Sequence, residues 1–278
     1  MTGNFAGDEF SFYLKYAQKN PSPYLFYFDF GSKEFLIGAS PEMMLRVEDG
    51  VAHTRPISGT ISRGKNAVDD HEKMLKLLSS EKERAELDML IDLGRNDLAR
   101  ICESPIEMRE YRTVEKYARV FHTVAHVCGK LRKEFSAIDA LIACFPAGTL
   151  TGAPKVAAMR EIEIHEKSRR NFYGGAIGYF SFSGEADTAI IIRTAHLKKN
   201  KVYFRTGATL HFDCDPAMEF LETENKARAF LELLWKIYPQ HIFFKNPKNR
   251  FNVLFSIRIF IFRYFENRKI RLNEKNGG

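Results

Sequence analysis

The sequence has few of the features typical of secreted proteins, of small domains stabilised by zinc, or of membrane-spanning proteins. Its four cysteines are widely spaced and include no Cys-x-x-Cys pair: Cys102, Cys128, Cys144 and Cys214. This spacing indicates reduced, buried thiols of a cytoplasmic protein, and it argues against both a disulfide framework and zinc ligands. The first ten residues lack the basic start and apolar run of a signal peptide. No stretch has the length and apolarity that predict a membrane span.

The body of the chain also lacks a net charge. The formal charge of +7 falls after residue 240, where nine Lys and Arg residues stand against two Glu, while the first 240 residues hold 33 basic and 33 acidic residues. The electrostatic case for nucleic acid is therefore weak, and we expect neither nucleic acid nor a membrane as a partner. Residues 238–278 form a basic, Phe-rich tail that we predict to lie outside the fold; contact of this tail with a membrane surface or a nucleic acid is the weaker alternative.

Two stretches place pairs of glutamates on one face of a predicted helix. In Glu81–Leu98, Glu83 and Glu86 are three residues apart, so their carboxylates share a face, while leucines form an apolar face. A second helix is predicted to begin at Asp215-Pro216, and one of its faces carries Glu219, Glu222 and Lys226. Two such helices could converge on one hard cation, which prefers oxygen ligands. Taken alone, the pattern is explained more simply by two solvated acidic faces.

Turn signals and hydrophobic periodicity divide the rest of the chain into short elements. The pattern predicts short helices over 8–20 and after Ser136, hairpins around Gly31-Ser32 and across Asp49-Gly50, a strand over 119–128, and a three-stranded meander over 172–206.

Some residues in these elements have both a structural and a functional interpretation. By its pattern alone, His122 is a satisfied core histidine on a strand. Arg193 follows three isoleucines, so its side chain either reaches out of the sheet or is held inside to meet a carboxylate. The loop before a helix that begins near Ala153-Pro154 either presents that helix start to an anion or is an ordinary loop capped by Thr151.

Seven segments resemble, in their order, a known family: SPEMML, RPISGT, ERAELDMLIDLGRNDLARI, FPAGTLTGAPKVAAMREI, YGGAIGYF, AIIIRTA and ETENKARAF. Together they are similar to the chorismate-binding domain of anthranilate synthase component I and of aminodeoxychorismate, isochorismate and salicylate synthases. The similarity covers nearly all of residues 10–235. It implies an α+β fold, an antiparallel β-sheet sandwich flanked by helices, over residues 1–237. Members of the family begin with a further segment, so the resemblance implies a domain truncated at the front.

The resemblance implies Mg²⁺ as the cofactor. Glu86 and Glu222 would ligate it directly, with Glu83 and Glu219 reaching it through water, as suits an ion that retains several waters. The metal would hold the ring carboxylate of chorismate.

The resemblance also implies roles around the substrate. It assigns substrate binding to six residues: Gly59 through its backbone N–H, Thr60, Tyr173, Arg193, the backbone at Gly207, and Lys226, which would pair with the acidic cluster. Glu42 would be the general acid that protonates the departing C4 hydroxyl. His122 and Thr149 would line the ring pocket, and His122 would assist the later loss of pyruvate.

The leading hypothesis is therefore an anthranilate synthase large-subunit reaction, in which chorismate and ammonia give anthranilate and pyruvate. The ammonia would come from a glutamine amidotransferase subunit or domain. Ser58 stands where aminodeoxychorismate synthases with a covalent lysine carry that lysine, which disfavours that route. Isochorismate or salicylate synthesis stays open as an alternative, because the lysine that decides it lies upstream of residue 1 in the family. A non-catalytic remnant is the alternative from a different class.

Overall fold

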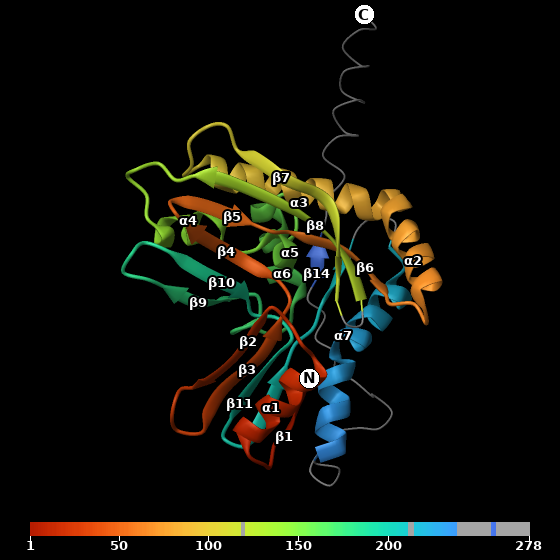
Figure 1. Ribbon diagram of the computed structural model, residues 1–278. Coiled ribbons are helices and arrows are strands. Elements are labelled where there is room, and N and C mark those ends of the chain that lie inside the picture. Colours follow the sequence, from red (N-terminus) through yellow and green to blue (C-terminus); the bar gives the residue numbers. More distant parts are fainter. Residues whose placement is uncertain (118–119, 211–213, 238–256, 260–278) are drawn as a thin grey trace, which may run out of the picture.

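The computed structural model describes residues 1–117, 120–210, 214–237 and 257–259 (Figure 1). Its helices are α1 (Glu9–Lys19), α2 (Ala67–Ser79), α3 (Glu81–Ala99), α4 (Ala137–Cys144), α5 (Gly148–Thr151), α6 (Lys155–His165) and α7 (Pro216–Ile237). Its strands are β1 (Thr2–Asn4), β2 (Tyr24–Asp29), β3 (Glu34–Ser40), β4 (Met43–Glu48), β5 (Val51–Thr54), β6 (Ile57–Ser62), β7 (Glu107–Lys116), β8 (Val120–Lys130), β9 (Ala176–Phe180), β10 (Ala186–Ile190), β11 (Thr194–Lys198), β12 (Lys201–Phe204), β13 (Ala208–Leu210) and β14 (Ile257–Ile259).

The strands build two antiparallel sheets, as the α+β prediction requires. A five-stranded sheet has the order β1-β12-β11-β3-β2, and a seven-stranded sheet has the order β6-β8-β5-β4-β10-β9, with β7 paired to β8. The two sheets share two continuous stretches of chain, because β3 leads directly into β4 and β10 leads into β11. Each stretch leaves one sheet and enters the other at the same place, so the connections Pro41-Glu42 and 191–193 lie side by side.

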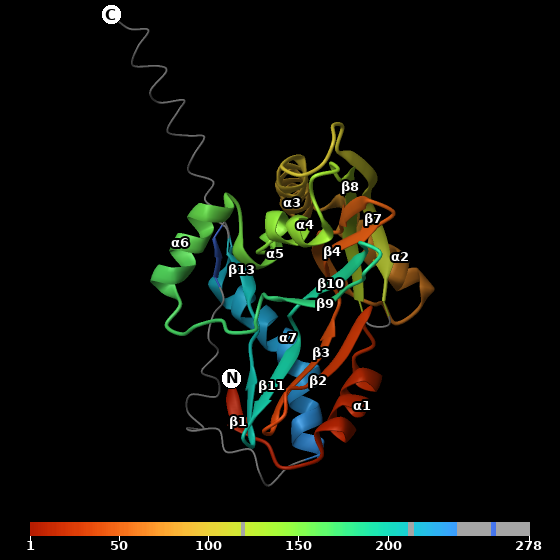
Figure 2. The same ribbon diagram turned by 90° about the vertical axis from the view of Figure 1, so that its left-hand side faces the viewer.

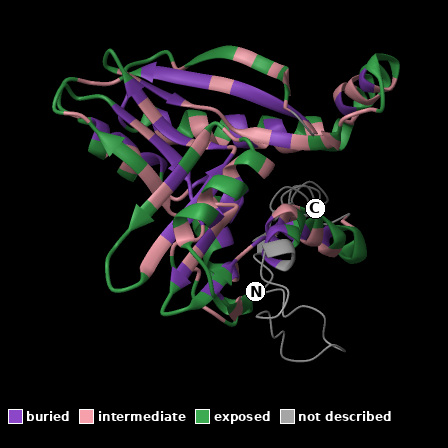
Figure 3. Ribbon diagram, turned by 60° about the horizontal axis from the view of Figure 1, so that its bottom comes forward, coloured by how far each residue is buried: buried purple, intermediate pink, exposed green. Residues whose placement is uncertain are grey.

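Helices cover each sheet and enclose two apolar cores. Against the seven-stranded sheet, α3, α4 and α5 bury side chains such as Leu87, Ile91 and Leu150 (Figure 2). Against the five-stranded sheet, α1 and α7 bury aromatic side chains that include Phe12 and Phe230. Figure 3 shows the buried residues gathered along the strands and inner helix faces, with exposed residues on outer faces and loop tips.

Local signals explain where these elements begin and turn. Asp8 accepts a hydrogen bond from Ser11 N at the start of α1, and Ser136 forms a capping box with Asp139 at the start of α4. Asp215 Oδ1 accepts a hydrogen bond from Ala217 N at the start of α7. The hairpin turns at Gly31-Ser32 and Asp49-Gly50 have positive φ at each of these residues. The predicted helices, both hairpins and the strand containing His122 are thus confirmed.

Several expectations were wrong in detail. Residues 172–206 do not form one meander, because the middle run breaks at 191–193 and its halves belong to different sheets. Thr151 does not cap α6: its N-cap is Pro154, and Thr151 Oγ1 donates to the Ala147 carbonyl within α5. Cys214 is partly exposed, whereas the other three cysteines are buried, reduced thiols as expected.

The tail lies almost entirely outside the described residues. Only Ile257–Ile259 is described, as β14, which pairs in parallel with β13. The prediction that 238–278 lies outside the fold therefore stays a prediction. Within the described ranges no single helix has the length and apolarity to cross a membrane, although the bent pair Ala137–Thr151 and Lys155–His165 meets these criteria jointly.

Candidate active site

The centre of the site is the place where the two sheets exchange strands. Hydrogen bonds hold the two connections together: Ser40 Oγ donates to the Ile190 carbonyl at 2.6 Å, and Ile190 N donates to the Glu42 carbonyl at 3.0 Å. Arg193 has a left-handed backbone, with φ of 49°, which turns the chain from β10 into β11. The junction therefore brings Glu42 and Arg193, 151 positions apart in the sequence, to adjacent connections.

The Arg193 guanidinium is held inside, in agreement with one of the two interpretations of its sequence. Burial lowers the pKa of this guanidinium, and the nearby groups of Tyr16, Glu42 and Tyr117 partly offset that effect. Tyr16 Oη, on α1, also donates to the Arg193 carbonyl at 3.0 Å, and this hydrogen bond ties the backbone turn at Arg193 to α1. A buried guanidinium with an acidic side chain close by is suited to receive a further carboxylate from a ligand.

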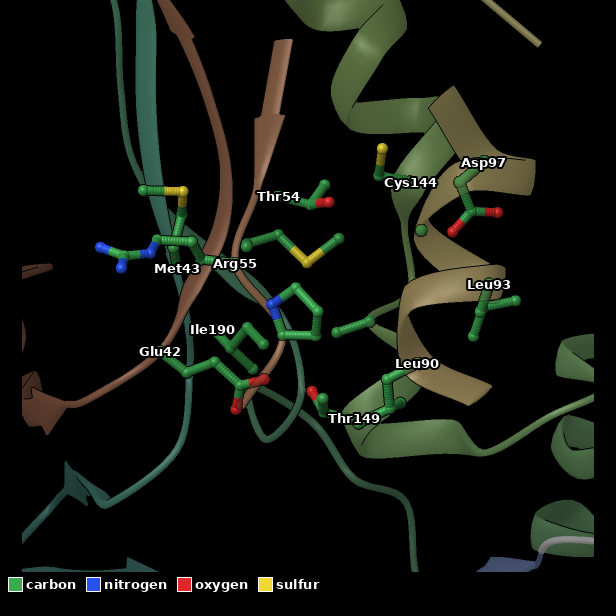
Figure 4. A pocket seen from close by; sticks show the side chains of 15 residues that line it. Glu42, Met43, Thr54, Arg55, Leu90, Leu93, Asp97, Cys144, Thr149 and Ile190 are labelled. Carbon is green, nitrogen blue, oxygen red and sulfur yellow. The ribbon is translucent and has the colours of Figure 1, made fainter. Parts of the chain in front are cut away.

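A cavity of about 50 Å³ opens beside this junction, between β4 and the helices α3 and α5. Figure 4 shows the Glu42 carboxylate and the Thr149 hydroxyl pointing into the same space. Both residues are buried, and Thr149 Oγ1 makes no hydrogen bond to the described residues. A Cβ at Gly148 would lie 2.2 Å from Leu93 Cδ2, so a side chain there would force Leu93 to shift at the place where α5 meets α3 and presents Thr149 to the cavity. An unpartnered buried hydroxyl facing an acidic group suits a polar ligand.

His122 lies on β8 and is 4% exposed. Burial above all, and then the charges of Arg193 and Lys226, lower its pKa to about 4, while the Gly59 carbonyl opposes the shift. Its Nδ1 lies 2.9 Å from Thr60 Oγ1 and 3.3 Å from the Gly59 carbonyl oxygen. Because a carbonyl can only accept, the Gly59 contact favours the tautomer with the proton on Nδ1. The imidazole is then neutral at neutral pH, and its Nε2 can take up a proton.

The four predicted glutamates come together from α3 and α7. Burial raises the pKa of Glu83, and the charges of Glu86, Glu222 and Glu219 raise it further. Burial and Glu222 likewise raise the pKa of Glu219. Lys82 connects the two helices, with its Nζ 3.7 Å from Glu219 Oε1. The convergence is observed, whereas the role of these carboxylates as metal ligands stays a prediction.

The surroundings of the cluster place it next to the other site residues. Lys226 forms an ion pair with Glu222 and donates to the Gly207 carbonyl at 3.0 Å, and Thr209 Oγ1 lies 3.4 Å from Glu86 Oε1. At Gly59, where φ is 73°, a Cβ would lie 3.0 Å from Glu83 Oε2. Neighbouring carboxylates whose charges raise the pKa values of Glu83 and Glu219 fit a hard divalent cation, which would cancel the repulsion.

Tyr173 was assigned to the binding of the enolpyruvyl carboxylate by resemblance alone. In the structure, two arginines to which the sequence analysis gave no role lie against its ring. The guanidinium carbons of Arg170 and Arg205 each lie 5.8 Å from its ring centroid. Glu166 pairs with both arginines at 2.7 Å, which holds the segment before Tyr173 against the strand that leads to Gly207. Arg205, two residues before Gly207, could have been noticed from that spacing. Tyr117 and Lys82 carried no signal in the sequence.

Comparison with known proteins agrees with this geometry. The model of the chorismate binding enzyme family matches residues 1–232. Anthranilate synthase component 1 from Saccharolobus solfataricus is 45% identical over 226 residues, which are 81% of this chain and 53% of that protein. The same component from Neisseria meningitidis serogroup B is 46% identical over 232 residues, 83% of this chain and 47% of that protein. The chain thus spans about half the length of the curated relatives it matches.

Solved structures give the same result. Anthranilate synthase component I from Streptococcus pneumoniae TIGR4 superposes with a TM-score of 0.72 at 41% identity, covering 82% of this chain and 50% of that one. The menaquinone-specific isochorismate synthase from Escherichia coli superposes with a TM-score of 0.74 at 22% identity, covering 84% of this chain and 54% of that one, and shows the fold alone. On the match over residues 1–232 and the identity to these relatives, this chain belongs to the chorismate-binding enzyme family.

Proposed function

We propose that this chain carries the large-subunit reaction of anthranilate synthase, in which chorismate and ammonia give anthranilate, pyruvate and water. The observation that carries the proposal is the meeting of four glutamates from α3 and α7 beside a site that holds Arg193, Glu42 and His122. Chorismate has two carboxylates and a hydroxyl that must leave. The site offers a cation site, a buried arginine and an acid, which correspond to these groups. The names of the relatives support the same reaction.

Substrate binding divides between the two sides of the site. Arg193, Tyr173 and the backbone at Gly207 hold the enolpyruvyl carboxylate, since a guanidinium fork binds a carboxylate through two hydrogen bonds. Glu86 and Glu222 would hold Mg²⁺, and Glu83 and Glu219 would support it through bound water. When bound, this ion supplies positive charge for the ring carboxylate. Gly59 N–H assists there, and Lys226 limits the charge of the acidic cluster.

Proton transfer then falls to Glu42 and His122. Glu42 gives its proton to the C4 hydroxyl, which leaves as water while ammonia adds at C2. His122, neutral with Nε2 available, takes the proton from C2 as the C3–O bond breaks and the ring becomes aromatic. The departing enolpyruvate takes up a proton at its methylene carbon and becomes pyruvate. Thr149 positions the ring beside Glu42. Ammonia comes from a glutamine amidotransferase partner, which the name "component 1" of the relatives supports.

The test is an assay of the 278-residue chain with chorismate, Mg²⁺ and an ammonium salt, followed by anthranilate fluorescence and product chromatography. We expect anthranilate and pyruvate in equal amounts, loss of both products in Arg193→Gln, and retention in Arg46→Gln, which changes an exposed arginine of β4. Formation of isochorismate or salicylate would overturn the choice of reaction. A folded chain that binds chorismate without any turnover would identify a non-catalytic remnant.

A further inference from the structure

A second group of ligand-type side chains lies on the seven-stranded sheet, apart from the carboxylates. His53 is on β5, and His126 and Cys128 are on β8. His53 pairs directly with Cys128 across the two strands, and His126 is two positions from Cys128, so all three side chains emerge on one face. Their neighbours Ala52 and Val127 belong to the apolar core on the opposite face.

The distances within this cluster are close to those of a coordination site. One nitrogen from each histidine and the Cys128 sulfur all lie within 4.8 Å of one another. His53 Nδ1 and His126 Nε2 are 3.0 Å apart. Around a tetrahedral zinc ion, with bonds of about 2.0 Å to nitrogen and about 2.3 Å to sulfur, ligand atoms lie roughly 3.3–3.7 Å apart. Small side-chain adjustments would therefore bring these three atoms to coordination distance.

A carboxylate approaches the cluster from the third strand. Glu107 on β7 pairs with Cys128 on the side opposite to His53, and its Oε2 lies 3.8 Å from Cys128 Sγ. Glu107 lies on the same face and also pairs with Arg109, whose Nε is 3.6 Å from Glu107 Oε2. A rotation of the Glu107 side chain would bring it to the cluster as a fourth ligand. The arrangement joins neighbouring residues of β5, β8 and β7 and requires no distant loop.

The charges around the cluster decide which kind of ion it can accept. His53 and Cys128 are buried and His126 is half-buried, and Arg109 lies near both imidazoles. Arg46, Arg55 and Arg109 lie near enough to oppose a bare dication. Glu107 and Glu110 supply compensating negative charge, and Cys128 adds to it once ion binding has displaced the thiol proton. Nitrogen and thiolate ligands select zinc-like ions over Mg²⁺.

We propose that His53, His126 and Cys128 form a binding site for Zn²⁺, with Glu107 as the fourth ligand, separate from the four-glutamate cluster. On binding, the Cys128 S–H bond breaks, a sulfur–zinc bond forms, and one proton passes to solvent. The ion links β5, β7 and β8 in the half of β8 beyond His122. The spacing of the cysteines gave no such signal, because Cys128 is the one cysteine of the set and the other proposed ligands are histidines and a glutamate, two of them from other strands.

The test uses Co²⁺, whose tetrahedral thiolate complexes absorb in the visible and near ultraviolet, as a probe for Zn²⁺. The reduced, chelator-stripped chain is titrated with Co²⁺ in excess Mg²⁺, which occupies oxygen-ligand sites without competing for the thiolate. We expect one equivalent of Co²⁺ with a sulfur-to-cobalt charge-transfer band, and bleaching of that band by one equivalent of Zn²⁺. Absence of the band at saturating Co²⁺ would overturn the proposal.

Variants locate the site. Cys128→Ser should abolish the charge-transfer band, and His126→Gln should weaken Co²⁺ binding at least tenfold, a lower bound set by the effect of losing outer-shell contacts. The matched controls are Cys102→Ser, the buried thiol that donates to the Gly129 carbonyl, and His71→Gln, an exposed histidine; both should keep the band. Because His126 is only partly buried, its variant decides the matter if Cys128→Ser fails to fold. A band unchanged in His126→Gln would contradict the assignment.

Discussion

The strand β8 passes two clusters of ligand-type side chains, and they are assembled in different ways. Near its start, His122 contacts Gly59, and Gly59 in turn lies next to Glu83 of the glutamate cluster, which two helices more than 100 residues apart in the sequence deliver. Near its end, His126 and Cys128 meet His53 and Glu107 from the two adjacent strands. The first cluster repels itself through like charges, whereas the second is built from neutral groups and one carboxylate.

The ligand types in the two clusters determine which metal ions each end of β8 can bind. A set of neighbouring carboxylates, of which Glu83 and Glu219 have raised pKa values, suits a hard cation that neutralises them and binds a substrate carboxylate in turn. Neutral imidazoles and a buried thiol are poor ligands for a hard cation and good ligands for a borderline or soft one. We therefore expect Mg²⁺ and Zn²⁺ to act independently on this chain, at the two ends of β8.

The largest expected effect concerns Glu42, the proposed proton donor at the junction of the two sheets. Replacing Glu42 with Gln keeps its size and removes the acid, so we expect kcat for anthranilate formation to fall ~10²–10⁴-fold with little change in KM for chorismate. Steady-state assays at saturating ammonium would measure this. The control is Glu48→Gln, which changes the exposed partner of Arg46 in the same strand. An unchanged kcat in Glu42→Gln would remove Glu42 from the reaction.

Single variants can test directly whether the two clusters bind their ions independently. Glu86→Gln should weaken Mg²⁺ binding at least ~100-fold, judged from what metal sites lose when ligands are disturbed, and should leave the Co²⁺ band of the second cluster intact. Cys128→Ser should give the opposite pattern. Calorimetric titration with Mg²⁺ and absorbance titration with Co²⁺ would measure both. Glu81→Gln, an exposed position on the same helix, serves as control. Loss of both responses in either variant would show that the clusters are linked.

The sequence predicted those features that a single element determines. The capping residues Asp8, Ser136 and Asp215 fixed helix starts, and the three-residue spacing in α3 and α7 put the glutamates in pairs. The break at 191–193 escaped prediction because a fully buried strand is a continuous apolar run, which shows no period where it changes sheets. The strand β7 was also missed, since charged residues interrupt its alternation.

In the site, too, only the features that lie within a single element could be predicted from the sequence. The pairing of the glutamates was visible on each helix, but the meeting of the two pairs required a resemblance to a family, because no local pattern encodes how α3 and α7 approach. The second cluster depends on the strand register that sets His53 opposite Cys128. A one-residue change in that register would place the histidine on the core face. Register of this kind becomes visible only in the assembled sheet.

A pH series separates the buried histidine of the first end from the rest. The pKa of His122 is lowered to about 4 in the folded state, below its ordinary value of 6.5, so the unfolded state binds more protons between these values. The free energy of unfolding should therefore fall by about 2–3 kcal/mol from His122 alone as pH drops from 6.5 to 4. Denaturant titrations of the wild type and of His122→Gln would measure it, with the variant showing a shallower pH dependence. His71→Gln, an exposed histidine, should retain the wild-type slope.

The smallest effect tests the self-repulsion of the glutamates by its sign. The folded-state pKa of Glu83 is raised by burial and by three other carboxylates, so its ionisation costs stability as pH rises above the ordinary value of 4.5. Without divalent ions at neutral pH, Glu83→Gln should therefore stabilise the chain, by roughly 0.5–1 kcal/mol for a partly exposed charge. With saturating Mg²⁺ the same variant should be less stable than the wild type, because it contributes one carboxylate fewer to the ion.

Thermal unfolding of both proteins with and without Mg²⁺ provides the measurement, and Glu81→Gln, at the exposed start of α3, provides the control. A reversal of sign on adding Mg²⁺ separates a cation site from a merely crowded acidic face, since a crowded face would favour Gln under both conditions. Destabilisation by Glu83→Gln in the absence of ions would mean that Glu83 is held by favourable contacts. Repulsion among the four carboxylates would then no longer be a reason to expect a cation there. The two ends of β8 would no longer differ in the electrostatic way proposed here.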